Sequence, residues 1–320
     1  MPKPRFPLQR RNLLKAGASA LTLAAASAAF GKDDRVLRIG YQKGWLSILR
    51  GRGTLERALA PLGASVRWTE FNAGPVQLEA LNVGAIDFGD VGEAPPIFAQ
   101  AAGAPLVYVG TTVPRPRLES VLVPKDSVIR TVADLKGKRV AFNKGSNVHY
   151  FLLKLLDKHG LKYSDVQTVF LSPPDARAAF EKGAVDAWVI WEPFLSAGQK
   201  ALDARILADA TGVANNRQYY FSSRDFATKN PDLLKIALQQ ISEIDTWIGA
   251  NRPAAAKELS QVLGLDVAVT TQYLDRVAYG TRAITGDILA EQQAIADTFF
   301  DLKLIPSRLN LLHAAPVALN

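Results

Sequence analysis

Three short loops bring glycine and small polar residues together where a predicted strand is followed by a predicted helix. They cover residues 42–44, 89–96 and 143–147. The first N–H groups of a helix have no partner within the helix and lie at the positive end of its dipole, so they suit an oxyanion. If the three loops come from two neighbouring lobes, they converge on one cleft. The sequence therefore predicts a binding site for a small anion.

Residues that common enzymes use for catalysis are missing or badly spaced. The chain has no cysteine, which excludes a thiol nucleophile, a disulfide bridge and a zinc site built on cysteine. Its three histidines are His149, His159 and His313, and no two of them stand four residues apart. The motifs G-x-S-x-G and G-x-G-x-x-G and the P-loop are also absent. We therefore expect a protein that is not an enzyme and that binds no metal or cofactor.

A strand near the other edge of the second predicted lobe carries aromatic side chains. In residues 186–194, the alternation of a strand places Trp188 and Glu192 on one face and Trp191 on the other. We expect Trp188 in the core. Trp191, at the end of the strand, offers an apolar wall and an indole N–H donor. Upstream, Asp175 precedes a predicted helix over 176–182 and is expected to cap it.

The first 31 residues are typical of an export signal. They contain five basic residues and no acidic one, followed by a stretch rich in alanine and leucine and by small residues at 26–29. The pair Arg10-Arg11 resembles the twin-arginine signal. The apolar stretch is too short to span a bilayer, which takes about 20 apolar residues. We expect a soluble periplasmic protein, without a lipid anchor because no cysteine is available for one.

Removal of this segment changes what the net charge implies. The formal charge of +8 falls to +3 without the five basic residues, so there is no reason to expect nucleic acid as a partner. With 48% hydrophobic and 21% charged residues, the composition is that of an ordinary globular protein. The length of 320 residues suits two lobes or one large domain.

The rest of the chain alternates predicted strands and helices. Residues 36–41 and 139–142 are strand-like, and each runs into one of the glycine loops. Apolar residues follow at helical spacing from 151 to 159. Strand, tight loop and helix in succession form the βα unit of a mainly parallel α/β sheet. Residues 81–88 resemble 180–188, which predicts the same unit once in each of two lobes.

Two segments are candidate crossings between these lobes. One is the proline-rich 112–117 and the other is the polar and aromatic 215–221. They predict a signal at 1–31, a first lobe formed by 35–114 and 219–320, and a second lobe at 115–218. After the second crossing, Asn230 and Pro231 are expected to begin a long helix that packs around the first lobe.

Several stretches resemble the periplasmic aliphatic sulfonate-binding proteins of ABC importers, within the nitrate, sulfonate and taurine-binding group. They are residues 37–44, 71–75, 78–84, 95–103, 131–137, 140–146, 175–180 and 185–188. The resemblance implies a type II periplasmic-binding fold, in which two α/β lobes joined by two crossings hold the ligand in the cleft between them. It also implies a membrane permease and an ATPase as partners. We expect the binding protein itself to be a monomer.

The resemblance further implies which residues hold the ligand. The sulfonate head is expected on backbone N–H groups and small polar side chains of both lobes, and the organic tail against aromatic rings. Acidic side chains beside a sulfonate repel it unless they point away, orient donors or receive a cationic group such as an amine. By position, the site residues are Gln42, Lys43, Gly92, Glu93, Gly145, Ser146, Asn147, Asp175, Trp191 and Glu192.

Other ligands and one other role fit the same residues. Taurine, sulfate esters, nitrate or another small anion stay open as ligands, and an exported ligand sensor stays open as an alternative to import. Thiamine-pyrimidine synthases resemble these binding proteins, but they depend on a cysteine-containing motif, and this chain has no cysteine.

Overall fold

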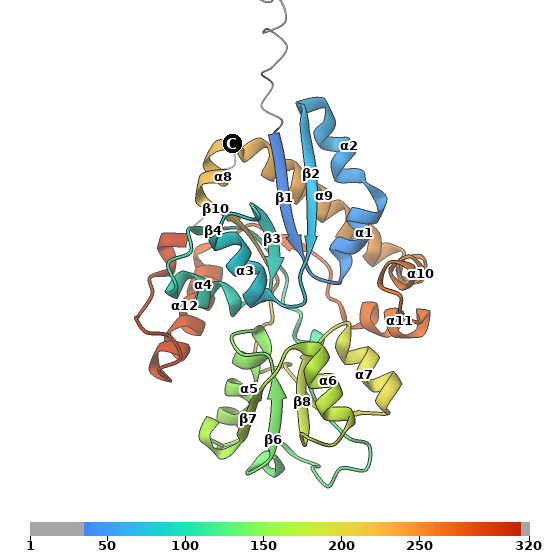
Figure 1. Ribbon diagram of the computed structural model, residues 1–320, viewed down its shortest axis with the longest axis vertical. Helices are drawn as coiled ribbons and strands as arrows, with labels where there is room; N and C mark the ends of the chain where they lie inside the picture. The colour runs from blue at the N-terminus through green and yellow to red at the C-terminus, as the bar shows by residue number, and fades with distance from the viewer. Residues whose placement is uncertain (1–34, 315–320) are drawn as a thin grey trace, which may run out of the picture. The chain divides into compact units, whose positions relative to one another are not determined.

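The computed structural model describes residues 35–314, and these residues form two mixed β-sheets. The first sheet has six strands in the order β11-β4-β10-β3-β1-β2, and the second has five in the order β7-β6-β8-β5-β9. We refer to each sheet with its helices as the first and the second lobe (Figure 1). The strands of the first lobe are β1 (Arg35–Tyr41), β2 (Ala64–Glu70), β3 (Phe88–Val91), β4 (Leu106–Thr112), β10 (Tyr219–Ser223) and β11 (Thr281–Arg282). Those of the second lobe are β5 (Glu119–Val123), β6 (Arg139–Phe142), β7 (Gln167–Phe170), β8 (Ala187–Trp191) and β9 (Arg205–Asp209).

Parallel and antiparallel pairs occur in both sheets. Strand β1 pairs in parallel with β3, and β6 pairs in parallel with β7 and β8. Strand β10 runs antiparallel between β3 and β4, and β5 runs antiparallel between β8 and β9. Because β10 follows β9 in sequence, the chain returns to the first sheet after completing the second. The predicted class, α/β with two lobes, is confirmed.

Helices pack on both faces of the first sheet. One apolar core joins α1, α2, α9 and α10 to the sheet, and another joins α3, α4 and α12 to it. Helix α9 begins at Pro231 after Asn230, as predicted, and buries Leu234, Ile241 and Ile248. The helices are α1 (Trp45–Arg52), α2 (Thr54–Leu59), α3 (Gly74–Asn82), α4 (Pro95–Ala101), α8 (Arg224–Lys229), α9 (Pro231–Ala250), α10 (Arg252–Leu263), α11 (Val267–Arg276) and α12 (Gly286–Asp301).

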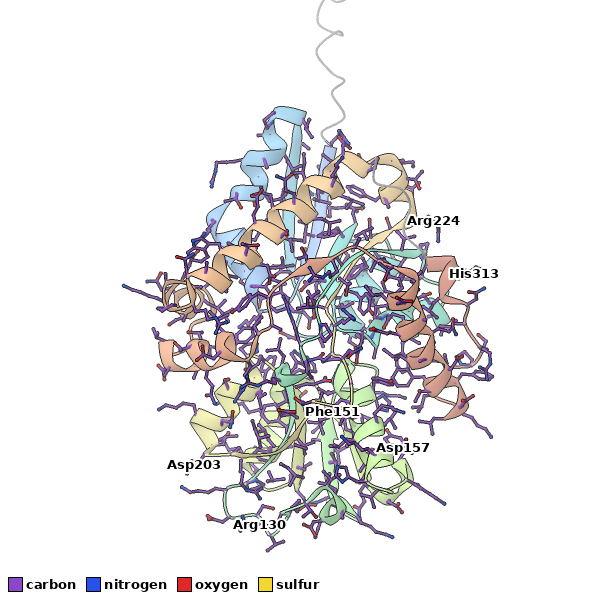
Figure 2. All side chains as sticks on the ribbon, turned by 180° about the vertical axis from the view of Figure 1, so that it is seen from behind. Arg130, Phe151, Asp157, Asp203, Arg224 and His313 are labelled. Carbon is purple, nitrogen blue, oxygen red and sulfur yellow. The ribbon has the colours of Figure 1, made fainter. Side chains whose placement is uncertain are left out.

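The second sheet is also covered on both faces. Helix α5 (Asn147–Lys158) packs on one face, and α6 (Pro173–Glu181) and α7 (Phe194–Leu202) pack on the other. Figure 2 shows Phe151 of α5 within this lobe and Asp157 of the same helix at its periphery. Trp188 has no exposed surface and lies in the core of the α6 and α7 side, as predicted.

The start of α6 differs from the sequence prediction. The helix begins at Pro173 rather than near 176, and its N-cap is Ser172, whose hydroxyl accepts a hydrogen bond from the backbone N–H of Asp175. Prolines suit the first helical positions because they lack the N–H groups that would be unpaired there. The prediction that Asp175 caps this helix was therefore wrong, since Asp175 lies in its first turn.

The sequence echo between 81–88 and 180–188 corresponds to one local structure that occurs in each lobe. Arg38 at β1 binds Asp87 through its backbone N–H (3.0 Å) and its Nε (2.8 Å). Arg139 at β6 binds Asp186 in the same way, at 2.8 and 3.1 Å. Each arginine also donates to the carbonyl of a glycine with positive φ, Gly84 or Gly183. The repeated aspartates are thus structural.

The two segments that join the sheets are hydrogen-bonded to each other. The backbone N–H of Arg115 donates to the carbonyl of Asn215 at 2.9 Å, and Asn216 Nδ2 donates to the carbonyl of Arg115 at 3.0 Å. The predicted lobe boundaries at 114 and 218 remain a prediction. No helix within residues 35–314 is long and apolar enough to cross a membrane. The predicted export signal at 1–31 lies outside the described residues.

Candidate functional site

A small cavity of about 60 Å³ lies where the two lobes and the two crossings meet. The first lobe contributes the loop after β1 and the end of β3. The second lobe contributes the start of α5 and the end of β8. The predicted site residues that line it are Gln42, Lys43, Gly92, Asn147, Trp191 and Glu192.

Two predicted acidic residues have their side chains elsewhere. Glu93 is buried beside the second crossing, where its Oε2 accepts a hydrogen bond from the backbone N–H of Arg217 at 3.2 Å. Asp175 is exposed, and its Oδ2 accepts a hydrogen bond from the Ser172 hydroxyl at 2.6 Å. Neither residue lines the cavity.

Gly145 and Ser146 belong to the loop that positions α5, but they do not line the cavity either. Gly145 has a φ of 76°, and its N–H donates to Nδ1 of the buried His149 at 3.2 Å. The Ser146 hydroxyl donates to the carbonyl of Asn143 at 2.7 Å. Both residues therefore shape the turn into the helix, and Asn147 is the residue of this loop that reaches the cavity.

Asn147 contacts the first lobe at Gly92. A Cβ on Gly92 would lie 2.9 Å from the Cβ of Asn147, so a glycine is needed for this close approach. Asn147 Nδ2 donates to Glu119 Oε2 at 2.7 Å and to Asn216 Oδ1 at 3.0 Å. The amide of one side chain thus connects the second lobe with a crossing at the wall of the cavity.

The first loop supplies an amide and a half-exposed cation. Gln42 Nε2 donates to Gln77 Oε1 at 3.2 Å, which fixes the amide at the cavity wall. Lys43 has 44% of its side chain exposed, and its Nζ lies 4.0 Å from Glu70 Oε1. Solvent screens the charge of Lys43, so it contributes little to holding a buried anion.

Glu192 and Trp191 form the wall at the end of β8. Glu192 accepts hydrogen bonds from the backbone N–H of Ser196 at 3.0 Å, from the Ser196 hydroxyl at 2.7 Å and from the Arg276 guanidinium. Burial raises the pKa of Glu192, while Arg276 and Ser196 oppose that rise. Its charge is balanced by Arg276. Trp191 packs edge-on against Phe194, with the ring centroids 6.2 Å apart.

Arg115 also lines the cavity, and no sequence pattern singled it out. Only 1% of it is exposed, its Nη2 pairs with Asp245 Oδ1 at 2.7 Å, and its Nε donates to the carbonyl of Ala278 at 2.8 Å. The guanidinium lies 4.4 Å from the centre of the Trp45 ring. Its Nη1 has no hydrogen-bond partner among residues 35–314. The sequence showed only an arginine between two prolines, which is equally typical of an exposed linker.

Asp90 at the end of β3 also lines the cavity. Its Oδ2 accepts a hydrogen bond from Gln218 Nε2 at 2.8 Å, whereas its Oδ1 has no partner among residues 35–314. Burial raises the pKa of Asp90 to about 7, although Gln218 and the charge of Arg115 partly oppose the rise. Asp90 falls in the predicted loop over 89–96, where no sequence pattern distinguished it from its neighbours.

The cavity thus combines a buried guanidinium, side-chain amides and an aromatic wall. A guanidinium and amides hold an anionic oxygen through charge-assisted hydrogen bonds, without any proton transfer. Within the part of the chain that the structure describes, no three histidine, aspartate or glutamate side chains gather as metal ligands. The chemistry that these groups support is the recognition of a small anion with an organic tail.

The chain matches proteins whose family and structure are known. Residues 65–247, more than half of the chain, match the family model described as NMT1/THI5 like. A relative from Escherichia coli (strain K12), provisionally named an aliphatic sulfonates-binding protein, is 41% identical over 94% of this chain and 95% of its own length.

Two solved structures share the fold along nearly the whole of their length. The periplasmic aliphatic sulphonate binding protein SsuA from Escherichia coli is 42% identical, with a TM-score of 0.80 over 88% of this chain and 91% of that chain. The alkanesulfonate-binding protein SsuA from Xanthomonas axonopodis pv. citri, bound to MOPS, is 41% identical, with a TM-score of 0.85 over 89% and 99%. The chain therefore belongs to the NMT1/THI5-like family and, within it, to the aliphatic sulfonate-binding proteins.

Proposed function

We propose that this protein is the periplasmic solute-binding component of an ABC importer that takes up aliphatic sulfonates as a source of sulfur. It binds the sulfonate between its two lobes and delivers it to a permease, which an ATPase drives. Contacts that form only when both lobes touch the ligand favour the closed state.

The observation that carries the proposal is Arg115, a cavity-lining residue whose buried Nη1 has no hydrogen-bond partner among residues 35–314. A buried donor without a partner costs free energy, and a sulfonate oxygen would satisfy it. A sulfonate stays anionic over the physiological pH range, so it needs donors rather than a base. The relatives named as aliphatic sulfonate-binding proteins support the same ligand class.

The site and the cellular setting are part of the proposal. We infer that Gln42, Lys43, Gly92, Asn147, Trp191 and Glu192 line the ligand site. Gly145 and Ser146 support it through the turn into α5. We also infer that the protein is a monomer and is not an enzyme. We infer that a twin-arginine signal directs its export and that it is soluble in the periplasm.

A thermal-shift panel tests this function. The chain without residues 1–31 is unfolded and refolded to remove carried ligand, then melted with alkanesulfonates, arylsulfonates, sulfate esters, nitrate and sulfate. A ligand at one hundred times its Kd stabilises the folded state by about 2.7 kcal/mol. At about 1.5–2 °C per kcal/mol for a chain of this length, that predicts a rise in Tm of about 4–5 °C with alkanesulfonates.

The panel also separates the alternatives. A rise with nitrate or sulfate but not with any organosulfonate would replace the proposed ligand by an inorganic anion. No rise with any compound would remove anion recognition and favour a sensor of another ligand. Hydrolysis of a sulfate ester during the assay, followed by release of sulfate, would contradict the inference that the protein is not an enzyme.

A further inference from the structure

The two lobes touch each other on both sides of the cavity, and the two contacts differ in chemistry. Figure 1 shows α7 and α11 on one side of the molecule and α4, α5 and α12 on the other. The cavity lies between these sides, with Trp191 and Tyr273 at the first and Pro95 and Asn147 at the second. We refer to the contact of α7 with α11 as the polar flank, and to the contact of α4 and α12 with α5 as the aromatic flank.

The polar flank is formed by one arginine and the residues around it. Arg276 of α11 pairs with Glu192 at the end of β8 and donates to the Ser196 hydroxyl at 2.8 Å. Gln199 of α7 accepts hydrogen bonds from the same guanidinium and, at 3.1 Å, from Gln272 Nε2. If this flank opens, water can replace each partner across it, and Ser196 continues to hold Glu192 within the second lobe.

The aromatic flank consists of packed rings. The centroid of the His149 ring in α5 lies 6.4 Å from that of Phe98 in α4 and 5.6 Å from that of Phe299 in α12. Phe299 also packs against Tyr150, at 6.0 Å. Burial lowers the pKa of His149 to about 4, so its ring is uncharged near pH 7. His149 and Phe299 have no exposed surface, so separation of this flank would expose apolar rings to water, which is unfavourable.

The second crossing is held to both sides of the aromatic flank. Asn216 Oδ1 accepts a hydrogen bond at 3.0 Å from Asn147, the first residue of α5. Arg217 Nε pairs with Glu291 Oε2 of α12 at 2.7 Å. The chain therefore passes from one lobe to the other beside the contact that is more costly to separate.

We propose that the lobes separate at the polar flank and pivot about the aromatic flank, with Arg276 as the clasp that keeps the polar flank closed. This inference rests on the proposed function, in which the lobes part to admit a sulfonate, and it specifies the direction of that movement. Tyr273 and Arg276 stand three positions apart on α11 and so lie on one face of the helix. Release of Arg276 from Glu192 therefore draws Tyr273 away from Trp191 and opens the cavity on that side. Arg276 is then a positioning residue, which acts on affinity without lining the cavity.

Two pairs of spin labels measure the movement at each flank. Because the chain has no cysteine, substituted cysteines carry the only labels. Lys200→Cys with Val267→Cys reports on the polar flank, and Asp157→Cys with Leu302→Cys reports on the aromatic flank, all at exposed positions. Pulsed electron paramagnetic resonance gives both distances with and without 1-butanesulfonate. The ligand is expected to shorten the distance at the polar flank and to leave the distance at the aromatic flank unchanged.

Arg276→Gln tests the clasp itself. Without ligand, it should lengthen the distance at the polar flank only. Because a ligand binds less tightly when its binding-competent arrangement is less populated, titration calorimetry should show about 10- to 100-fold weaker binding of 1-butanesulfonate. Arg52→Gln is the matched control, since it breaks an arginine–glutamate pair with Glu258 at 2.7 Å that lies within the first lobe. It should lower the Tm and change neither the two distances nor the Kd.

Gln272→Ala separates the position of the lobes from the charge at the cavity. Loss of Arg276 also leaves the charge of Glu192 unbalanced, and that charge would repel a sulfonate. Gln272→Ala removes only the neutral hydrogen bond to Gln199, so it should lengthen the distance at the polar flank and weaken binding about 2- to 10-fold. This variant also tests the clasp if Arg276→Gln does not fold. An unchanged distance at the polar flank in every variant that folds would overturn the inference, even if affinity is lost.

Two further outcomes would overturn the inference and leave the proposed function intact. One is a larger change with ligand at the aromatic flank than at the polar flank. The other is no change at either flank while calorimetry shows that 1-butanesulfonate binds. Failure of the unmodified protein to bind any alkanesulfonate would instead refute the proposed function itself.

Discussion

Replacement of Asp90 by asparagine should stabilise the ligand-free protein in a pH-dependent way. Burial raises the pKa of this carboxyl from its ordinary value of 3.8 to about 7. Between these two pH values the unfolded chain has lost the proton and the folded chain keeps it. The free energy of unfolding therefore falls as the pH rises from about 4 to about 7 and stays low above that.

The size of the effect follows from the shift. Each pH unit between the two pKa values is worth about 1.4 kcal/mol, which gives a loss of about 4 kcal/mol by pH 8. Asparagine has nearly the same shape and can still accept the hydrogen bond from Gln218 Nε2. Because asparagine carries no charge, it is free of this loss. The free energy of unfolding of Asp90→Asn, compared with that of the unmodified protein, should therefore be about 4 kcal/mol more favourable at pH 8 than at pH 4. The Tm difference grows by about 6–8 °C.

The assay is a set of thermal and urea melts of both proteins from pH 4 to pH 9, after refolding to remove ligand. Burial also raises the pKa values of Glu93 and Glu119, so the stability of the unmodified protein alone reports several groups. The difference between the two proteins isolates Asp90. Asp225→Asn removes a carboxylate at an exposed position and serves as the control for the substitution itself. A constant difference between Asp90→Asn and the unmodified protein across this range would refute the reasoning.

Three further perturbations test other parts of the site and its export. Arg115→Lys keeps a charge but loses the planar fork, so calorimetry should show about 10- to 100-fold weaker alkanesulfonate binding, and an unchanged Kd would rule out a contact with the sulfonate. Trp191→Ala should weaken long-chain sulfonates more than short ones, and equal losses would show that Trp191 does not contact the tail. Replacement of Arg10 and Arg11 by lysine should abolish export in cell fractionation, and intact export would contradict the twin-arginine assignment.

The fold could be predicted well because its signals are local. The strand at β6, the glycine turn after it and the apolar face of α5 each follow from a few neighbouring residues. The repeat around Asp87 and Asp186 was visible for the same reason. The start of α6 was misjudged because two helix-capping residue types, Ser172 and Asp175, stand three positions apart, and the prolines between them decide which one caps.

Sequence patterns identified mainly those site residues that stand next to a predicted strand. Gln42 and Gly92 reach the cavity because each comes directly after a strand of the first sheet. Glu93 is the next residue after Gly92, but its side chain turns toward Arg217. The direction of one loop side chain depends on packing between distant segments, which no local pattern encodes. The partner that fixes Arg115 in the cavity, Asp245, lies 130 residues further along the chain.

Arg115 connects ligand recognition to the joint between the lobes. Its backbone N–H and carbonyl bind Asn215 and Asn216 in the other crossing, and its side chain reaches the cavity. Asn216 is in turn held by Asn147, the first residue of the helix that the second lobe presents to the cavity. A ligand that pairs with Arg115 and contacts Trp191 therefore touches the crossings and the second lobe together. We expect such a ligand to favour the arrangement in which the lobes are close, because a ligand shifts an equilibrium only through contacts that differ between the two states.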